Sequence, residues 1–366
     1  MKITVKGLFI QAAVLVCLIL PGCDTAAPES SGQADRGALQ SLSIMSWNIQ
    51  TFFDGEDEGT EYEEYRASAG WNGEKYQARL TALAQAIGKT GGQGPDILAF
   101  MEVENPQVLE DMARGELSKQ GYNWTSFANN PGYSLGVGVL SRFPFTVTRS
   151  HSLTVNGETT PRPILEIWLT PQDKPLVLFI CHWKSKLGGD DVTEPQRRAS
   201  ARVLQRRLAE IRRDEPGTPV VIMGDLNENH DEFYRRSGSE ICALLPDDQK
   251  AAELVSLHTG PVDFLVTSRE KPPKSVYVNM DAPPLYSPWG NELLEGTYNY
   301  KNTWETIDHF LMNDAFFDKT GWEFDTCRVL KVEPFVKSSG YPNGYNPRTG
   351  SGHSDHLPLL LKLKVF

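Results

Sequence analysis

The chain has 366 residues, a formal net charge of −11 and 40% hydrophobic residues. This length permits one or two domains with a sizeable core. The acidic balance argues against indiscriminate binding to a polyanion through bulk electrostatics, although a local basic cleft or bound cations can reverse the sign at one site.

The N-terminus has the pattern of a secretory signal. After a start with lysines, residues 8–20 form an apolar run that is shorter than the ~20 residues of a membrane-spanning helix. The run ends in Leu-Pro-Gly-Cys, which resembles the lipobox of bacterial lipoproteins. We therefore expect residues 1–22 to be removed, Cys23 to be lipidated, and the exported protein to be membrane-anchored, facing the periplasm or the cell exterior. A plain cleaved signal with an incidental cysteine is the alternative.

Residues 23–40 are rich in Ala, Ser, Gly, Pro and acidic residues and have almost no large apolar side chain, which predicts a flexible tether. From residue 41 to residue 366 the composition is mixed and shows no second linker, so we expect one large domain. This domain contains Cys181, Cys242 and Cys327. Their odd number and wide spacing match no zinc pattern and allow at most one disulfide.

Short apolar runs bounded by Gly, Pro, Asn or Asp alternate with amphipathic stretches, which predicts a mixed α/β fold. The expected strands are, in chain order, 42–48, 97–102, 135–140, 164–169, 176–182, 220–224, 306–312 and 357–365. The expected helices are 76–87, 108–117 and 200–211. Most of the arginines in and around the last helix are interpreted as its solvated face. Two groups of strands with helices outside them would make a layered sandwich.

Acidic, amide and imidazole side chains recur where the predicted strands end. Asn48, Glu102 and His182 each close a strand, and Asp225 follows another. Polar groups at strand ends can converge in one cleft while the strands hold them rigidly. Burying Glu102 without a partner would cost several kcal/mol, so a cation or a basic side chain is expected nearby. A lone histidine beside a core strand, such as His182, is more often structural.

The segment Gly224-Asp225-Leu226-Asn227 follows a strongly apolar strand. The glycine permits a tight turn, and Asp225 and Asn227 share one side if the backbone stays extended. A carboxylate can orient or deprotonate a water, and an amide can hydrogen-bond a phosphoryl oxygen. An Asx-rich turn with no catalytic role is the alternative interpretation.

Asp355 and His356 lie at the start of the last predicted strand. Asp355 offers a hard oxygen ligand suited to Mg²⁺ or Mn²⁺, and His356 can bind phosphate or exchange a proton near neutral pH. Because strand faces alternate, Asp308 points away from Ile307 and His309 and can orient an imidazole such as His356. His309 is interpreted as mainly structural, and a polar loop capping a strand remains the alternative for Asp355 and His356.

Each of these signals is weak alone, but their order along the chain is specific. Together they resemble the endonuclease/exonuclease/phosphatase superfamily, which includes pancreatic-type deoxyribonucleases, apurinic endonucleases, neutral sphingomyelinases and inositol polyphosphate phosphatases. The motifs that carry the resemblance are Trp47-Asn48, Glu102, His182, Gly224–Asn227, Ile307–His309 and Ser354–His356. The resemblance covers residues 41–366 and implies a four-layered α/β sandwich, in which two packed mixed β-sheets are flanked by helices.

The resemblance further implies a divalent-metal-dependent phosphoesterase with one or two Mg²⁺ (or Mn²⁺) ions. The implied metal ligands are Asn48, Glu102 and Asp355, and the implied catalytic residues are His182, Asp225, Asn227, Asp308 and His356. In this scheme Asp225 activates the attacking water, the histidines stabilise the pentacoordinate phosphate, and Asp308 holds His356. Asn227 steadies the water and the phosphate.

Nucleic acid is the expected substrate of this enzyme, and we expect a monomer. Arg162 falls where a substrate-contacting arginine often lies in the superfamily, and the run from His182 to Lys186 is similar to one in extracellular nucleases. Arg162 and Lys184 would then contact a phosphodiester backbone; a solvated loop is the alternative for the lysine.

Other substrates and one non-enzymatic role remain open. A lipid-anchored enzyme would suit a phospholipid or sphingomyelin, although only residues 283–289 offer a candidate surface loop for a membrane. An inositol phosphate is a further alternative substrate. A non-catalytic binding module that keeps the fold is the alternative outside chemistry.

Overall fold

The computed structural model describes residues 40–277, 282–293 and 295–366. The predicted signal, the Cys23 lipid site and all but the last residue of the predicted tether lie outside the described residues. Within the described part of the chain, none of the helices has the length and apolar character needed to cross a membrane.

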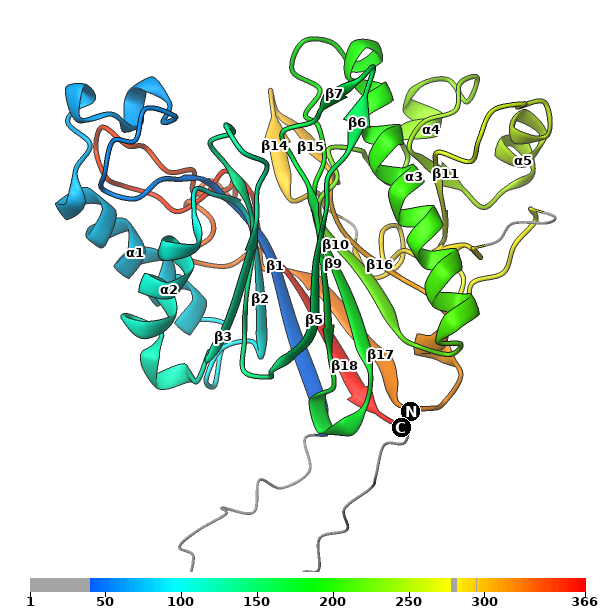
Figure 1. Cartoon of the computed structure of the whole chain (residues 1–366), viewed down its shortest axis with the longest axis horizontal. Helices are drawn as coiled ribbons and strands as arrows, with labels where there is room; N and C mark the ends of the chain where they lie inside the picture. The colour runs from blue at the N-terminus through cyan, green and yellow to red at the C-terminus, as the bar shows by residue number, and fades with distance from the viewer. Residues whose placement is uncertain (1–39, 278–281, 294) are drawn as a thin grey trace, which may run out of the picture. The chain divides into compact units, whose positions relative to one another are not determined.

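Two mixed β-sheets and the helices outside them make up the described chain (Figure 1). The six-stranded sheet has the order β17-β18-β1-β2-β4-β3, and the eight-stranded sheet has the order β11-β12-β13-β16-β10-β9-β8-β5. Figure 1 shows α1 and α2 outside the first sheet and α3 outside the second. This is the four-layered α/β sandwich expected from the sequence.

The elements have the following bounds. The six-stranded sheet contains β1 (Ser41–Phe52), β2 (Ile97–Val103), β3 (Trp124–Ala128), β4 (Gly136–Ser141), β17 (Trp322–Val329) and β18 (Leu359–Val365). The eight-stranded sheet contains β5 (Phe145–His151), β8 (Ile164–Leu169), β9 (Leu176–His182), β10 (Val220–Asp225), β11 (Leu244–Pro246), β12 (Leu265–Ser268), β13 (Leu285–Tyr286) and β16 (Asp308–Met312). Two short hairpins are formed by β6 (Thr154–Val155) with β7 (Glu158–Thr159) and by β14 (Tyr298–Tyr300) with β15 (Thr303–Glu305).

The helices are α1 (Gly73–Gly88), α2 (Pro106–Arg114), α3 (Asp190–Asp214), α4 (Glu232–Arg235) and α5 (Gln249–Ser256). Short 3₁₀ turns occur at Glu63–Tyr65, Ala67–Ala69, Ser118–Gln120, Pro171–Asp173 and Asp314–Phe317. Side-chain oxygens of Asn72 and Asn105 accept hydrogen bonds from the first turns of α1 and α2, which fixes where these helices begin.

Every strand and helix predicted from the sequence is present, but several strands were missed. Of these, β3, β5 and β17 lie at sheet edges. An edge strand is covered less completely, so its sequence lacks the continuous apolar run that marks a buried strand. The burial of β5 alternates between partly buried and exposed positions, whereas β9 is buried along its whole length.

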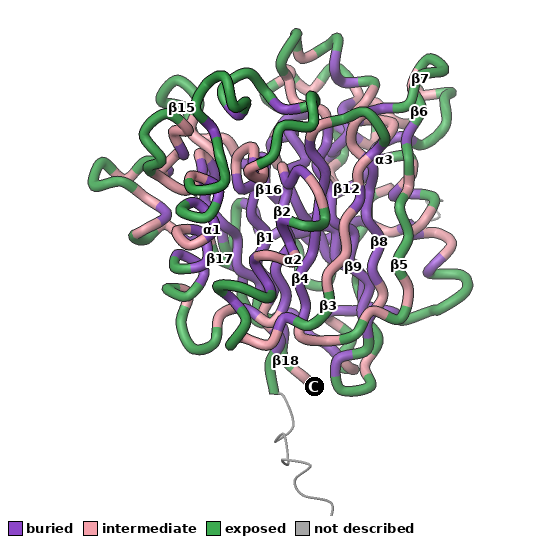
Figure 2. Tube along the Cα trace, turned by 60° about the vertical axis from the view of Figure 1, so that its left-hand side comes forward, coloured by how far each residue is buried: buried purple, intermediate pink, exposed green. Residues whose placement is uncertain are grey.

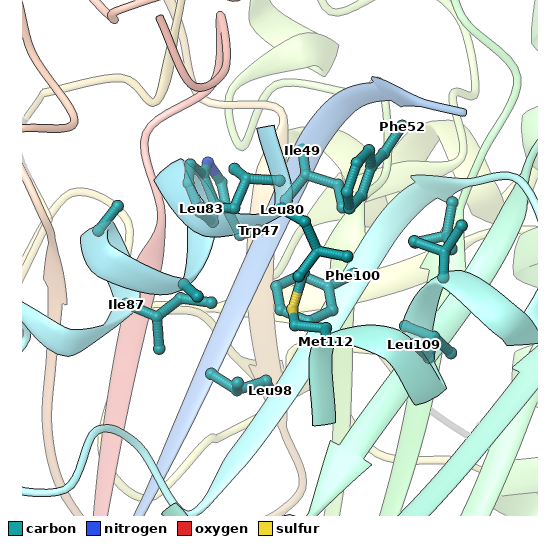
Figure 3. Close-up of a cluster of buried hydrophobic side chains, with 14 of the residues drawn as sticks. Trp47, Ile49, Phe52, Leu80, Leu83, Ile87, Leu98, Phe100, Leu109 and Met112 are labelled. Atoms are coloured by element: carbon teal, nitrogen blue, oxygen red, sulfur yellow. The ribbon is translucent and has the colours of Figure 1, made fainter. Parts of the chain in front are cut away.

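The strands are buried because apolar side chains fill the spaces on both faces of each sheet. One cluster lies between the two sheets and contains, for example, Leu178 and Met223. Figure 3 shows the cluster under α1 and α2, where Trp47 and Phe100 of the first sheet meet Leu83 of α1. In Figure 2 the inner strands of both sheets are accordingly buried, whereas the edge strand β5 and many of the surrounding loops are exposed.

Most arginines in and around α3 are solvated as expected, because Arg202, Arg206, Arg212 and Arg213 are exposed. Other charged side chains of this helix face inward. Arg197 is completely buried and pairs with Glu194 and Glu228. Arg207 donates two hydrogen bonds of 2.9 Å to Glu166 of β8, whose side chain is also fully buried. An arginine can enter the interior when carboxylates there balance its charge and accept its hydrogen bonds.

Glu166→Gln is expected to lower the free energy of unfolding by about 3 kcal/mol, because it leaves Arg207 without its buried counter-charge. Burial acts to raise the pKa of Glu166, but hydrogen bonds from His151 and Arg207 outweigh it and hold the pKa below its usual range. A lowered carboxyl pKa stabilises the fold above the unfolded-state pKa, and this stabilisation is lost as the pH falls through the folded-state value.

Urea unfolding of wild type and Glu166→Gln at several pH values measures this effect. The difference in unfolding free energy should stay constant from pH ~6 to pH ~8 and narrow below pH ~4, because the unfolded carboxyl titrates near ~4.3. A difference that is the same at all these pH values would contradict the ion-pair explanation.

Candidate active site

The second sheet places three of the predicted site residues side by side. Asp225, the last residue of β10, pairs with His182 of the parallel strand β9 and with Asp308 of the antiparallel strand β16. Gly224 makes this possible through close approach and not through the tight turn expected from the sequence. A Cβ atom at Gly224 would lie 1.9 Å from the carbonyl oxygen of Cys181, and its φ is +127°.

The first sheet supplies the remaining predicted residues at the same end of the sandwich. Asn48 of β1 lies opposite Met101 of the parallel strand β2, beside Glu102. The segment before β18 is fixed to β1, because the indole N–H of Trp47 donates to the carbonyl oxygen of His356 at 2.9 Å. Asp355 and His356 are thereby brought to the C-terminal end of β1.

A single oxygen of Asp225 forms the centre of the site. Its Oδ2 accepts a hydrogen bond of 3.0 Å from the amide nitrogen of Asn48. The Nε2 atoms of His182 and His356 lie 3.6 Å and 3.9 Å from the same oxygen. Glu102 joins this group, because its Oε1 lies 3.1 Å from the Asn48 nitrogen and 3.8 Å from His182 Nε2. The tertiary structure therefore brings these five residues together.

Asn48 presents its amide nitrogen, and not its oxygen, to the carboxylates of the site. The oxygen accepts a hydrogen bond from the backbone N–H of Gln50 at 3.0 Å. These hydrogen bonds match an amide that holds Glu102 in place, while the metal ligation that the resemblance implies for Asn48 stays a prediction. Asn48 also lies within β1, which continues to Phe52, and does not close it as the sequence pattern indicated.

His356 and Asp308 form a buried hydrogen-bonded pair with a length of 2.8 Å between Nδ1 and Oδ2. The hydroxyl of Thr297 donates to the same carboxylate oxygen. Burial disfavours the charged imidazole, but the carboxylates of Asp308, Asp225 and Asp355 outweigh it and raise the pKa of His356 to about 10. The pair therefore keeps His356 protonated and fixes the direction of its Nε2–H.

The pKa values of two other site residues are shifted in the direction that favours the neutral form. Burial raises the pKa of Asp225 to about 7, although the charge of His356 opposes the shift. Burial also lowers the pKa of His182 well below its ordinary value, and Arg162 acts in the same direction. The site thus combines a carboxylate that titrates near neutral pH with one charged and one neutral imidazole, which suits proton transfer and stabilisation of an anion.

A bulge in β1 positions Glu102 and Asp355, and sequence reasoning missed the residues that form it. Gln50 and Thr51 adopt positive φ angles of 55° and 50°. The N–H of Thr51 donates to Glu102 Oε2 at 2.7 Å, and the side-chain oxygen of Gln50 accepts the N–H of Asp355 at 2.9 Å. Positive φ is strained for a β-branched residue, so the surrounding structure must hold the bulge in place.

Arg79 of α1 holds this bulge from inside the protein. Its guanidinium donates to the carbonyl oxygens of Ile49 and Thr51 at 2.7 Å and 2.8 Å, and also to that of Gln50. The charge lies 3.8 Å from the centre of the Tyr345 ring. A signal for this role exists in the sequence, because Arg79 lies on the same helical face as the buried residues of α1.

The predicted substrate contacts lie beside the histidine strand. Arg162 donates to the carbonyl oxygen of Trp183, and the side-chain nitrogen of Asn227 donates to the same oxygen at 3.1 Å. A small cavity is lined by Arg162, His182 and Lys184. The ammonium of Lys184 bonds within its own loop, to the carbonyl oxygens of Ser185 and Leu187, and so is engaged by the protein itself.

The donor set fits a divalent metal ion. Ligand atoms of Asp225, Asp308 and His356 lie within 4.8 Å of one another, but the hydrogen bond between His356 and Asp308 already accounts for that closeness. In the described chain, Glu102 and the half-buried Asp355 have no charged cationic partner within ion-pair distance. The imidazole near Glu102 is that of His182, which burial keeps neutral. Hard carboxylate oxygens gathered in this way match the preference of Mg²⁺ and Mn²⁺.

Comparisons with known proteins identify the family and the fold of the chain. Residues 43–259 match the model of the Endonuclease/Exonuclease/phosphatase family. No match was found among curated protein sequences. Among solved structures the chain is similar to TDP2 from Caenorhabditis elegans, with a TM-score of 0.51, 14% identity, and coverage of 89% of this chain and 74% of that one.

Two structures from Bacteroides thetaiotaomicron have the same fold. One is an endonuclease/exonuclease/phosphatase family protein (TM-score 0.50, 16% identity, 89% of this chain and 98% of that chain). The other is a mannosyl-6-phosphatase (TM-score 0.50, 16% identity, 89% of this chain and 100% of that chain). The family match covers more than half of the chain and includes Asn48, Glu102, His182, Asp225 and Asn227, whereas Asp308, Asp355 and His356 lie beyond it. The chain belongs to the endonuclease/exonuclease/phosphatase family and is a metal-dependent phosphoester hydrolase.

Proposed function

We propose that the protein is a phosphodiesterase that hydrolyses nucleic acid by in-line attack of water. The observation that carries the catalytic part is the pair formed by Asp225 and His356, 3.9 Å apart. Their surroundings move their pKa values to about 7 and about 10 respectively, so that one can take a proton while the other carries positive charge. Such opposed environments separate a general base from an electrophilic stabiliser.

In the proposed step, Asp225 removes a proton from water as the water oxygen bonds to phosphorus. The bond between phosphorus and the ester oxygen breaks, and the leaving oxygen recovers a proton from solvent. His356 and His182 donate hydrogen bonds to the phosphoryl oxygens, where negative charge grows. Asp308 keeps His356 charged and oriented, and Asn227 steadies the water and the phosphate.

Glu102 and Asp355 would hold the divalent metal ion, which we infer to be Mg²⁺ or Mn²⁺. When bound, the ion supplies positive charge that neutralises the phosphoryl oxygens and the leaving group. Asn48 and Thr51 orient Glu102 through their hydrogen bonds, while Gln50 orients Asp355. These contacts leave the two carboxylates to supply the oxygen ligands for the metal ion.

Positive charge near the site supports a phosphodiester substrate in spite of the net charge of −11. Arg162 lies close enough to influence the pKa values of both His182 and Asp225. A local cation of this kind can bind a phosphate next to the reacting one. The name of the similar mannosyl-6-phosphatase makes a sugar phosphate the main competing substrate.

The structure gives less support to a membrane lipid as substrate. Residues 283–289, the candidate surface loop, are mostly buried and include β13, so that expectation was wrong. Trp289 packs in the core between the sheets, and its indole N–H donates to the carbonyl oxygen of Asp308. An apolar membrane contact would need these side chains to be exposed.

We also propose that the enzyme is exported and anchored through a lipid on Cys23. The proposal rests on the apolar run that ends in Leu-Pro-Gly-Cys. Expression of the full chain in a bacterial host with labelled palmitate tests it. Wild type should take up label and fractionate with membranes, whereas Cys23→Ser should do neither. Labelled Cys23→Ser, or unlabelled wild type that is secreted, would contradict the anchor.

His356→Ala is expected to lower kcat at least ~10²-fold with little change in KM, because it removes a donor that acts mainly on the transition state. Steady-state kinetics of wild type and His356→Ala on one shared substrate measure the change in kcat. His258→Ala, outside the site after α5, serves as the matched control and should keep wild-type kcat. A His356→Ala enzyme with near-normal turnover would rule out the assigned role.

A substrate and metal panel tests the proposed function as a whole. Plasmid DNA, RNA, sphingomyelin, an inositol phosphate, mannose 6-phosphate and bis-nitrophenyl phosphate are each incubated with Mg²⁺, Mn²⁺, Ca²⁺ or EDTA. We expect cleavage of nucleic acid with Mg²⁺ or Mn²⁺ and none with EDTA. Turnover that survives the chelator would refute the mechanism, and exclusive hydrolysis of mannose 6-phosphate would refute the nucleic acid assignment.

A further inference from the structure

The β14–β15 hairpin carries two tyrosines on the face that borders the site. Tyr298 pairs with Glu305 and Tyr300 pairs with Thr303, and alternate residues of a strand share one face. The two rings are nearly parallel, with an interplanar angle of 13° and centroids 6.5 Å apart. In Figure 1 the hairpin lies at the upper end of the two sheets.

This hairpin is fixed to the catalytic residues at its base. The ring of Tyr298 stacks on that of His356, with centroids 4.6 Å apart and planes 26° apart. The N–H of Leu357 donates to the carbonyl oxygen of Thr297 at 2.8 Å, and Thr297 in turn donates to Asp308. The tyrosine face therefore begins at the imidazole that is proposed to contact phosphate.

The hairpin is also rigid at its other end. Its loop residues, Lys301 and Asn302, have φ angles of 48° and 65°, which is the pattern of a tight type I′ turn. On the opposite face Trp304 stacks on Tyr341, with centroids 6.0 Å apart. The tyrosine face is thus held in place without any substrate contact.

The outermost ring is available to a ligand. Tyr300 is 52% exposed, whereas Tyr298 is half-buried between His356 and Tyr300. The ammonium of Lys301 lies over the Tyr300 ring, 4.9 Å from its centre, and is itself exposed, so a stacking base would displace it toward the backbone. An exposed aromatic face beside a cation is the combination that binds single-stranded nucleic acid, where the ring stacks on a base and the cation meets the backbone.

We propose that Tyr300 is a stacking platform for a nucleobase next to the scissile phosphate, with Lys301 contacting the adjacent backbone phosphate. The inference rests on the proposed function and assigns a substrate class to the same site: unpaired or unstacked nucleotides. The rings of His356, Tyr298 and Tyr300 lead outward from the reacting phosphate as a stack, with successive planes 26° and 13° apart. A flat π-system continues such a series more closely than the puckered ring of a sugar does.

A dinucleotide with one scissile bond tests the proposal because it fixes where the substrate binds. Dithymidine monophosphate is compared with two analogues in which a tetrahydrofuran replaces one or the other thymidine, so that a base is missing on a known side. For wild type, removal of one of the two bases should lower kcat/KM about 5- to 150-fold, the range that corresponds to base stacking on an aromatic side chain. Tyr300→Ala should show the same loss on the intact dinucleotide and no further loss on that analogue.

Two variants serve as controls. Tyr300→Phe keeps the ring and should retain wild-type kcat/KM, and Tyr234→Ala removes a tyrosine of similar exposure, 49%, on α4. An equal loss for Tyr300→Ala on all three substrates would mean a structural role and would overturn the platform, as would no loss on any. If wild type cleaves none of them but hydrolyses mannose 6-phosphate, the proposed function fails, and the stacking proposal falls with it.

Discussion

The amide of Asn48 joins the two halves of the catalytic site, and the remaining geometry depends on this contact. Its nitrogen donates to Glu102 in the first sheet and to Asp225 in the second. Sheet packing alone brings the strand ends near one another, but it does not fix two carboxylates in one orientation. A short amide with its oxygen held by Gln50 does so, because only its N–H groups remain to face the carboxylates.

The same site gathers several carboxylates in a largely buried volume. Cationic groups of the protein balance only part of their negative charge. His356 balances Asp308, and burial raises the pKa of Asp225 to about 7, so this carboxylate is only partly charged near neutral pH. Glu102 and Asp355 remain, and a divalent cation offsets carboxylates more effectively than the neutral His182 can. The site therefore carries an excess of negative charge that a divalent metal ion can balance, and the bound ion would in turn stabilise an anionic transition state.

Support for the site comes from residues that take no part in the proposed chemistry. Arg79 holds the strained bulge of β1, and Thr297 connects the hairpin to Asp308. These contacts couple helix α1 and the β14–β15 hairpin to the placement of Glu102 and His356. Catalytic precision of this kind requires rigid elements behind the reacting groups, which explains why buried polar contacts replace apolar packing at this end of the sandwich.

The sequence by itself determined the buried strands, the amphipathic helices and the polar residues at strand ends, because burial on both faces imposes a continuous apolar pattern that ends where the core ends. Edge strands such as β5 escaped prediction, since partial exposure removes that pattern. Only the tertiary structure decided which way Asn48 points, that Arg79 binds the carbonyl groups of the β1 bulge, and that Tyr298 stacks on His356. Each of these contacts joins residues far apart in the chain, and no local spacing encodes their distance.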